Sequence, residues 1–477
     1  MSINIHVNAS LAVATAGGAT ANFGVPMFVS EHTVTSNRQD GPYSSLAEVV
    51  AAGFTASAAA DVHGWATAVF SQNPRTSQVM IGRRLSGESL PTALDAIEAA
   101  APASWYATNI ATNTANDILA LATWTETRSK IAIAQSSAAA LLAGTASTQQ
   151  VSTFTVGGTT DGVYSIAAYN AWSGALIGTA SYTASGDTAN DIATALRSAW
   201  DGVAELAAIS APAAGTGADV EITFDGLGNG YTFVLTAASS LTEVTPAFVQ
   251  NVGELGSALG FNRTALIYHD DDTEYLDGAW TARCLSFALD APDGAGIWAY
   301  QRVSGVTATS LTTAQKTALL TGASAPVNYY APVTYTSGVE EAGFTFPGKM
   351  LSGRFIDTQT SIDLTRARIE EALLAAFLRA SSVNKKIKFT DDGIQLLAGT
   401  AQAVLDKLVR AGHYADQAVS SLTARRTPYI DAPAISSFSA AQKSARTVTL
   451  SGEAVFAGAI QSVGDAATVG LTIDLSF

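Results

Sequence analysis

Charged residues are scarce in this sequence. Of its 477 residues, 14% are charged and 48% are apolar, whereas about 25% of an average globular protein is charged. Alanine, threonine, serine and glycine take the place of the missing charges. Small neutral surfaces cost little to desolvate, so this composition suits a subunit that buries much of itself against copies of itself. An ordinary secreted or surface protein fits the same bias equally well.

Cysteine and long apolar runs are also nearly absent. Cys284 is the single cysteine, so neither an internal disulfide nor a cysteine metal cluster can form. Residues 1–7 lack the basic stretch and apolar run of a signal peptide. The longest apolar-leaning run, Ile131–Gly144, is shorter than the ~20 residues needed to span a bilayer. We therefore expect a protein made in the cytoplasm, without membrane insertion by this chain.

Positive charge is scarce and unevenly placed. The net charge is −15, which argues against bulk binding of DNA or RNA because such binding needs a basic surface. Residues 349–446 hold 14 Lys/Arg against 9 Asp/Glu, whereas residues 141–255 hold one basic residue, Arg197, against ten acidic ones. This segregation concerns partners and orientation and does not define the fold.

Motifs for catalysis are mostly missing. The histidines lack zinc-binding spacing, and no Gly-x-Ser-x-Gly sequence occurs. Gly226–Gly230 is glycine-rich but lies between predicted strands, which indicates a hairpin turn. Gly343–Met350 matches a phosphate-loop spacing up to its lysine, but Met350 stands where a hydroxyl should bind magnesium and Pro347 removes a backbone donor. We expect a plain loop there.

The best enzyme candidate is an acidic run after a predicted strand. His269, Asp270, Asp271 and Asp272, with Glu274 close by, could hold Mg²⁺ or Ca²⁺ beyond the carboxyl end of a strand, as in a metal-dependent hydrolase. The alternative is a solvated loop in which Asp272 or Thr273 caps the next helix. Because no second cluster completes a site, we expect no enzyme and no cofactor.

Strand and helix patterns alternate over residues 25–140 and again over 265–330. Strands are predicted at Val25–Ser30, Gln78–Arg83, Trp105–Ile110, Lys130–Gln135, Ala265–His269, Ile297–Val303 and Val327–Tyr330. Helices are predicted at Ser45–Ala52, Ala58–Gln72, Leu90–Ala100, Thr114–Thr127, Tyr275–Leu289 and Thr312–Thr321. Such alternation is typical of βαβ units with a largely parallel sheet.

Two further modules break this rhythm. Residues 146–255 are strand-rich and contain one predicted helix, Asp187–Trp200. After residue 346, Ser361 or Asp363 begins a long helix to about Ala380, and Thr390 caps another that reaches Arg410. Strands follow at Thr447–Phe456, Ala459–Val463 and Val469–Leu475.

The predicted fold is therefore α/β and α+β multidomain, with a largely parallel α/β core, a β-rich insert and a C-terminal α+β domain. Its segments are an N-terminal arm (1–22), the first part of the α/β domain (23–145), the acidic insert (146–255), the second part of the α/β domain (256–345) and the C-terminal domain (346–477).

Both ends of the chain alternate apolar and polar residues. The apolar positions are Ile3, Ile5 and Val7 at one end and Leu471, Ile473 and Leu475 at the other. One interpretation is two edge strands of the chain's own sheet. The other is that at least one end adds a strand to a neighbouring subunit, because backbone hydrogen bonds link such strands with little demand on side chains.

An ordered set of short phrases runs through both halves of the chain. These are Phe23–Pro26, Tyr43–Val49, Phe70–Pro74, Gly296–Gln301, Ser304–Thr307, Val327–Tyr330, Gly353–Asp357, Lys386–Ile394, Ala441–Arg446 and Val455–Ile460. Their order over residues 1–135 and 260–477 resembles the tail sheath proteins of contractile-tailed phages. The acidic insert lies outside the resemblance.

The resemblance implies a structural protein of the virion tail, assembled in the host cytoplasm, and not an enzyme. Such subunits form stacked six-fold rings around an inner tail tube, and contraction of the sheath drives the tube through the host envelope during genome delivery. The expected partners are further copies of the chain, the tail tube protein, the baseplate and the tail terminator or neck proteins. Energy stored in the lattice replaces nucleotide hydrolysis.

The charge segregation adds an orientation to this hypothesis. The basic module at 349–446 is expected to face the tube and the acidic insert to face outward. The candidate tube contacts are Arg366, Arg368, Arg379, Lys385, Lys386 and Lys388. A solvated helix face with local ion pairs is the alternative for these six residues. For the whole chain, the alternative is a surface-layer or adhesin-type protein.

Overall fold

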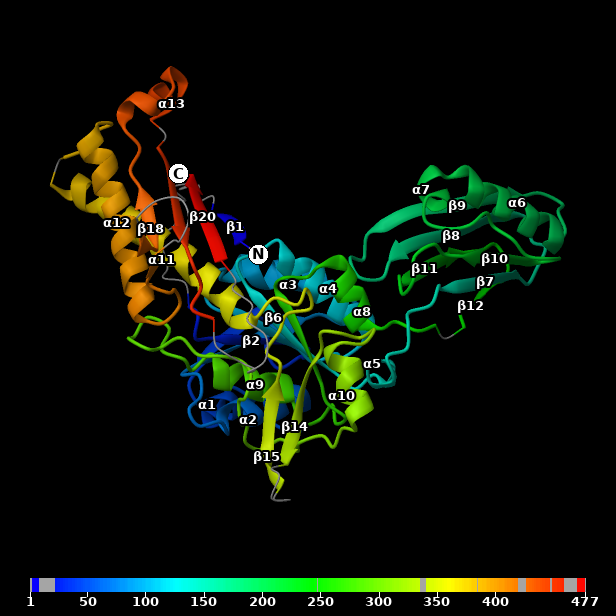
Figure 1. Ribbon diagram of the computed structural model, residues 1–477. Coiled ribbons are helices and arrows are strands. Elements are labelled where there is room, and N and C mark those ends of the chain that lie inside the picture. The colour runs from blue at the N-terminus through cyan, green and yellow to red at the C-terminus, as the bar shows by residue number, and fades with distance from the viewer. Residues whose placement is uncertain are drawn as a thin grey trace.

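The computed structural model describes residues 2–7, 22–246, 248–334, 340–383, 385–418, 426–446, 448–458 and 470–476. Figure 1 shows a central sheet with an insert projecting on one side and a helical module on the other. Within the described residues, no helix is both long enough and apolar enough to cross a bilayer.

An eight-stranded sheet forms the centre of the molecule. In spatial order its strands are β15 (Glu340–Phe346), β14 (Asn328–Thr334), β13 (Thr264–Tyr268), β6 (Ile131–Ser136), β5 (Ala107–Ile110), β2 (Pro26–Glu31), β4 (Val79–Arg84) and β3 (Gln39–Tyr43). The six inner strands pair in parallel, and the two edge strands are antiparallel. The predicted mixed α/β fold with a largely parallel sheet is confirmed.

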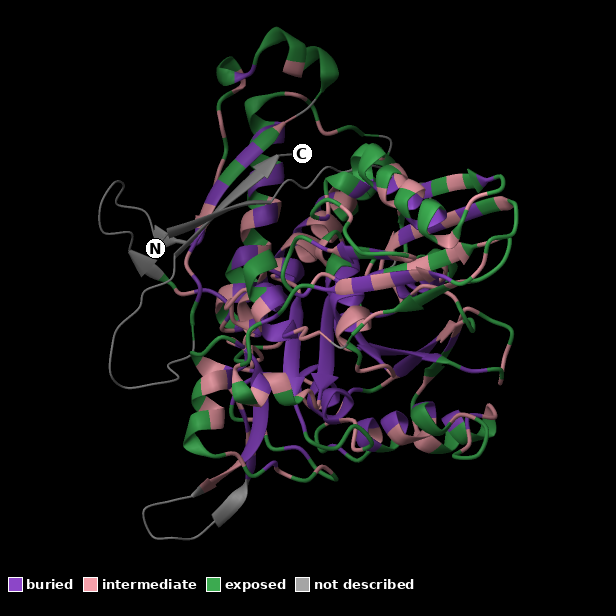
Figure 2. Ribbon diagram, turned by 90° about the vertical axis from the view of Figure 1, so that its right-hand side faces the viewer, coloured by how far each residue is buried: buried purple, intermediate pink, exposed green. Residues whose placement is uncertain are grey.

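Helices cover both faces of this sheet because neighbouring strand residues point to opposite sides. On β2, Phe28 packs with Trp65 of α2, whereas Met27 and Val29 pack with Leu94 of α3. The first face carries α1 (Leu46–Ala51), α2 (Ala60–Phe70) and α9 (Leu276–Cys284). The second carries α3 (Leu90–Ala100), α4 (Ala115–Glu126), α5 (Ala139–Ala143), α8 (Val252–Leu259) and α10 (Thr313–Leu320). The inner strands are accordingly buried (Figure 2).

Both edges of the central sheet carry features that hinder pairing with other chains. β3 contains Gly41 and Pro42 and has a register shift between Asp40 and Tyr43. Beyond β15, the Tyr300 amide donates to the Thr345 carbonyl (2.7 Å). The predicted strand Ile297–Val303 is nevertheless wrong, because Tyr300 has a φ of 57° and interrupts the extended backbone.

The segment Gly343–Met350 also differs from its prediction. Gly343 to Phe346 belong to β15, and the plain loop begins only at Pro347. The side chain of Met350, which stands at the magnesium-binding position of a phosphate loop, is fully buried in the core.

The insert is built from two three-stranded sheets and buries a core of its own. One sheet has the order β10 (Asp219–Thr223), β7 (Val151–Val156), β12 (Leu241–Val244); the other has β11 (Tyr231–Thr236), β8 (Gly162–Asn170), β9 (Leu176–Ala184). Two helices pack on them, α6 (Ala189–Gly202) and α7 (Ala204–Ala207). The hairpin predicted at Gly226–Gly230 is wrong, because β10 and β11 belong to different sheets and each pairs with another strand.

The two chain connections of the insert lie side by side. The Thr148 amide donates to the Val249 carbonyl (3.0 Å). The amide oxygen of Asn116 on α4 accepts hydrogen bonds from Trp172 Nε1 (3.1 Å) and Gln250 Nε2 (2.8 Å) and so holds the insert to the body. α8 packs in the core of the body and not in that of the insert. The domain boundaries at 145/146 and 255/256 stay predictions.

The C-terminal part combines long helices with a small sheet. Its elements are α11 (Ile356–Ser382), α12 (Asp391–Arg410), β16 (Gln417–Ala418), β17 (Arg426–Thr427), β18 (Tyr429–Asp431), the 3-10 helix η1 (Ile435–Ser437), α13 (Ala440–Ala445), β19 (Thr449–Ala454) and β20 (Gly470–Ser476). β1 (Ser2–Val7) completes a sheet of order β1-β20-β19-β18. The predicted strand Ala459–Val463 lies outside the described residues.

α11 begins earlier than predicted. Its N-cap is Phe355, so Ser361 and Asp363 lie buried inside the helix and do not begin it. Thr390 does cap α12, as predicted, by accepting a hydrogen bond from the Gly393 amide (3.3 Å). The polar residues inside α11 mislead a start-signal search because tertiary contacts use their side chains.

Candidate functional site

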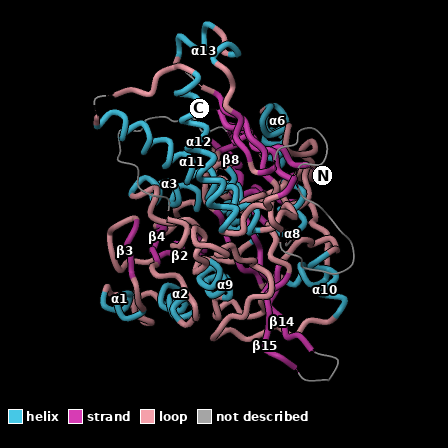
Figure 3. Tube along the Cα trace, turned by 60° about the vertical axis from the view of Figure 1, so that its left-hand side comes forward, coloured by secondary structure: helices cyan, strands magenta, loops and turns pink. Residues whose placement is uncertain are grey.

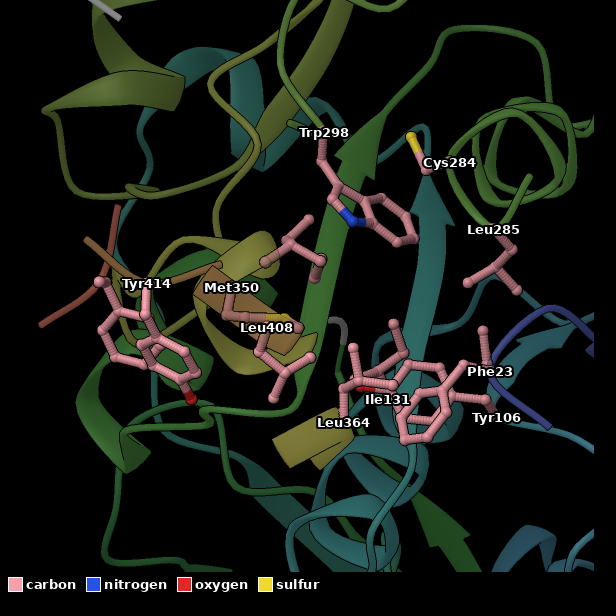
Figure 4. Close-up of a cluster of buried hydrophobic side chains, with 14 of the residues drawn as sticks. Phe23, Tyr106, Ile131, Cys284, Leu285, Trp298, Met350, Leu364, Leu408 and Tyr414 are labelled. Carbon is pink, nitrogen blue, oxygen red and sulfur yellow. The ribbon is translucent and has the colours of Figure 1, made fainter. Parts of the chain in front are cut away.

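Helices α11 and α12 lie beside each other and extend from the body (Figure 3). Their inner ends share one apolar core with the central sheet, which includes Ile131 of β6, Leu364 of α11 and Leu408 of α12 (Figure 4). Inside that core Asp363 accepts hydrogen bonds from Tyr106 Oη (2.8 Å) and from Arg263 Nη1 and Nη2 (both 2.8 Å). The body therefore fixes one end of the helix pair, and the other end is exposed.

A groove of about 1100 Å³ runs between the exposed ends of these helices. We call it the α11–α12 groove. Small residues line it from both helices: Ala372, Ala375, Ala376, Ala380, Gly399 and Ala403. Val383 (59% exposed) and Leu396 (55% exposed) add larger apolar side chains. Small side chains let another backbone approach closely, and an exposed apolar surface with a polar rim is typical of an interaction site.

The rim of the groove is basic. Five cations line it, Arg379, Lys385, Lys386, Lys388 and Lys407, against one acidic residue, Asp392. Across the part of the chain that the structure describes, Arg379, Lys385, Lys386 and Lys388 form no ion pair. A concave apolar surface with one sign of charge attracts a partner of the opposite sign. The groove is therefore suited to bind an acidic protein surface.

Only some of the six predicted tube contacts lie together in the structure. Four of them, Arg379, Lys385, Lys386 and Lys388, line the groove together. Arg366 instead pairs with Glu370 one turn along α11 (2.9 Å), as the alternative interpretation of a local ion pair expects. That these six residues face a tube stays a prediction.

Arg368 lies outside the groove and is engaged within the chain. Its guanidinium donates to Asp290 (2.6 Å) and Glu371 (2.8 Å), and its side chain is only 19% exposed. Lys407 Nζ reaches the same Asp290 (3.1 Å). Although burial alone would raise the pKa of Asp290, hydrogen bonds from Arg368 and Lys407 hold it below its ordinary value. No local sequence pattern indicates that Arg368 and Lys407 pair with Asp290, because both residues are far from Asp290 along the chain.

The terminal strands pair with each other inside one chain. β1 and β20 run parallel, with Ile3 opposite Leu471, Ile5 opposite Ile473 and Val7 opposite Leu475. Among the described strands β1 pairs with β20 alone, so it forms an edge of the four-stranded sheet. Exchange of these strands between subunits stays a prediction.

The central sheet has the strand order in which doubly wound folds bind ligands. In the order β4-β2-β5-β6-β13, the direction in which the chain adds strands reverses between β2 and β5. In doubly wound folds, ligands bind at such a switch point, beyond the carboxyl ends of its two strands. Aromatic side chains occupy the space between α2 and α9 here. The ring of Tyr275 lies against Gly64, and the ring of Trp65 lies against Gly278.

Beneath these rings lies a buried carboxylate. Asp277 in the first turn of α9 accepts a hydrogen bond from the Gly278 amide (2.8 Å), and its own amide donates to Gln135 Oε1 (3.4 Å). Burial raises the pKa of Asp277 to about 7. The rings of Tyr275 and Trp65 therefore pack α2 against α9 on this face of the sheet.

The acidic run at 269–274 is tied into neighbouring loops. Asp272 accepts hydrogen bonds from Asn113 Nδ2 (3.1 Å) and Ser137 Oγ (2.8 Å). Thr309 Oγ1 donates to Asp270 (2.8 Å), and Thr273 Oγ1 donates to Asp271 (2.6 Å). Among the residues that the structure describes, no group of three or more His, Cys, Asp or Glu side chains could hold a metal ion.

Glu274 and the fully buried His269 complete this network. Glu274 contacts His269 Nε2 (3.1 Å) and accepts from the Thr307 hydroxyl (2.7 Å). Burial opposes ionisation, but hydrogen bonds from Thr307 and His269 hold the pKa of Glu274 below its ordinary value. The prediction that Asp272 or Thr273 caps α9 is wrong. The N-cap is Tyr275, which has a left-handed backbone and makes no side-chain capping bond.

No model of a protein family matches this sequence, and no curated protein matches it. Solved structures that are similar to it include two phage-type tail proteins. A sheath tail protein from Listeria innocua is 8% identical, with a TM-score of 0.30, and the match covers 96% of each chain. A chain of the anti-feeding prophage baseplate is 11% identical, with a TM-score of 0.32, and the match covers 44% of this chain and 55% of that one.

The matched part spans little more than half of the baseplate chain. Both TM-scores lie below 0.5.

Proposed function

We propose that this chain is the structural subunit of a contractile tail sheath. Copies polymerise as stacked six-membered rings around an inner tail tube, and the sheath shortens to drive the tube through the host cell envelope during genome delivery. The proposal rests first on the ordered phrases shared with sheath proteins. The observation in the structure that supports it best is the α11–α12 groove, an exposed apolar surface with a basic rim.

In this proposal the groove faces the tube. Four cations that form no ion pair within the described chain, Arg379, Lys385, Lys386 and Lys388, supply the attraction. The acidic insert, which projects on the other side of the central sheet, faces outward (Figure 1). Baseplate proteins bind one end of the cylinder and terminator or neck proteins the other, and assembly takes place in the host cytoplasm.

The terminal strands link the subunits. In an isolated chain β1 pairs with β20, and in the assembled sheath the same pairing forms between neighbouring copies. Backbone hydrogen bonds then keep neighbours connected while their other contacts change.

A charge-reversal experiment tests the orientation. Arg379, Lys385, Lys386 and Lys388 are changed together to Glu, and co-sedimentation with the purified tube protein is measured at low and moderate salt. The matched control reverses four cations elsewhere: Arg75, Arg302, Lys316 and Lys443. We expect the groove variant to lose tube binding and the control to keep it. Equal binding by both variants would refute the proposed orientation.

A further inference from the structure

Asp290 lies where three parts of the chain meet. It follows α9 in the segment 285–295, and its carboxylate accepts hydrogen bonds from Arg368 of α11 and from Lys407 of α12. The Nε and Nη2 atoms of Arg368 lie 3.1 Å and 2.6 Å from Asp290 Oδ2, and Lys407 Nζ lies 3.1 Å from Oδ1. One carboxylate therefore joins both helices of the groove to the body. We call this group of three residues the Asp290 latch.

The surrounding segment is also attached to the end of α12. The Asp293 amide donates to the Arg410 carbonyl (3.0 Å), and the Ala295 amide donates to the Ala411 carbonyl (2.9 Å). His413 Nε2 lies 2.9 Å from the Leu289 carbonyl oxygen. The latch is thus part of a joint through which the body holds the helical module.

The two cations of the latch differ in their access to the groove. Lys407 lines the groove and its side chain is 51% exposed, whereas the side chain of Arg368 is 19% exposed and does not line it. The guanidinium of Arg368 also lies 5.8 Å from the ring centre of Phe23, near the start of the body. A carboxylate that enters the groove therefore competes with Asp290 for Lys407 and leaves Arg368 in place.

We propose that the Asp290 latch couples the groove to the joint: an acidic partner in the groove draws Lys407 away from Asp290 and loosens the attachment of α12 to the body. The inference rests on the proposed function in that it describes how the same groove responds to its partner. Because coupling between two sites is reciprocal, weakening the latch must strengthen binding in the groove.

The test uses a defined acidic probe and the full chain. The probe is a fluorescein-labelled amphipathic peptide of about 15 residues, long enough to form a helix, with an Ala/Leu face flanked by Glu. Its affinity is measured by anisotropy. We expect Asp290→Asn to tighten binding about two- to fivefold, the range for release of one partly exposed ion pair. In a chain that already carries Lys407→Ala, adding Asp290→Asn should no longer change the affinity.

A matched control separates the latch from a general charge effect. Glu371→Gln removes one negative charge from the other acidic contact of Arg368, which does not pair with Lys407. We expect Glu371→Gln to change peptide affinity much less than Asp290→Asn. Equal effects of the two substitutions would overturn the latch.

Amide hydrogen exchange gives a second test, because a charge effect alone does not change the exchange rates of backbone amides in the joint. On saturation with the peptide, the Asp293 and Ala295 amides of the native chain should exchange faster, whereas amides of the central sheet should not change. Unaltered exchange at both amides would overturn the coupling even if affinities differ. If the proposed function is wrong but the latch exists, the protein should respond to the peptide as expected and yet neither bind the tube nor form cylinders.

Discussion

Two glycines explain how α2 and α9 pack closely on one face of the central sheet. Gly64 and Gly278 each leave room for an aromatic ring of the other helix, Tyr275 and Trp65 respectively. The two helices can then approach closely and cover the buried carboxylate of Asp277. Close packing at such pairs leaves no room for an added methyl group.

Replacement of Gly278 by Ala should therefore destabilise the protein. The new methyl carbon would lie 2.5 Å from atoms of the fully buried Trp65 ring, which predicts a loss of about 1–3 kcal/mol in the free energy of unfolding. Gly399→Ala on α12 is the matched control, because nothing lies within 4 Å of its new carbon. We expect that control to gain about 0.5–1 kcal/mol from helix propensity. Urea unfolding of both variants checks the pair, and a Gly278→Ala protein as stable as the control would contradict the close packing.

Asp277 predicts a pH dependence of stability. Its pKa in the folded protein is about 7, above the ~3.9 of an exposed aspartate. The unfolded chain therefore loses this proton first, and stability falls as pH rises from about 4 through 7. Above pH 7 the loss in the free energy of unfolding is at most about 4 kcal/mol.

Asp277→Asn should remove that part of the pH dependence. Unfolding free energies of both proteins at pH 5 and pH 8 check this, and the native chain should lose more stability between them than the variant does. Asp357, whose pKa burial raises to about 6, gives a second variant of the same sign with a smaller effect. Identical pH profiles for native and Asp277→Asn proteins would be incompatible with a carboxyl group whose pKa is raised by burial.

At the scale of elements, the α/β alternation was predictable because local signals and packing agree. Ser45, Thr114 and Thr390 cap their helices by accepting hydrogen bonds from backbone amides, a role that Ser and Thr favour at helix starts. Helix α9 begins after the left-handed Tyr275 and ends at Cys284, before the predicted Leu289. The strand expected around Tyr300 is absent because the left-handed backbone of Tyr300 interrupts the extended pattern. Positive φ at a tyrosine has no local sequence signal, since tertiary contacts impose it.

The candidate site was predictable only in part. The excess of Lys and Arg at 349–446 located the module, and Ala372, Ala376 and Ala380, four residues apart, mark one helix face that could have revealed the groove. The pairing of Arg368 with Asp290 joins residues 78 positions apart. No local pattern contains such a contact, so sequence reasoning placed Arg368 on the tube surface and missed its place in the joint.

The insert is expected to fold independently of the body. It buries its own core around Phe154, Trp200 and Phe224, and its two ends are hydrogen-bonded neighbours at Thr148 and Val249. A fragment of residues 148–249 should therefore unfold cooperatively when heated, followed by circular dichroism. The chain with these residues replaced by a short glycine-serine linker should keep a folded body. A fragment without a cooperative transition would show that the insert depends on the body.

At the scale of the whole molecule, β1 pairs with β20 within one chain, and we propose that the same pairing forms between two chains in the assembled sheath. Ile3→Cys and Leu471→Cys place two thiols at directly opposed positions of the pair, and the native Cys284 is buried. Mild oxidation of the isolated chain should give a cross-linked monomer. Oxidation after assembly should give a ladder of covalent oligomers on a denaturing gel. Monomers alone in both states would contradict strand exchange between subunits.

We propose that copies of this chain build a cylinder around a tube. Negative-stain electron microscopy of the purified protein, with and without the tail tube protein, measures this most directly. We expect stacked rings or long hollow cylinders, and cylinders that enclose the tube where it is present. Stable monomers under all conditions, with or without the tube protein, would contradict it.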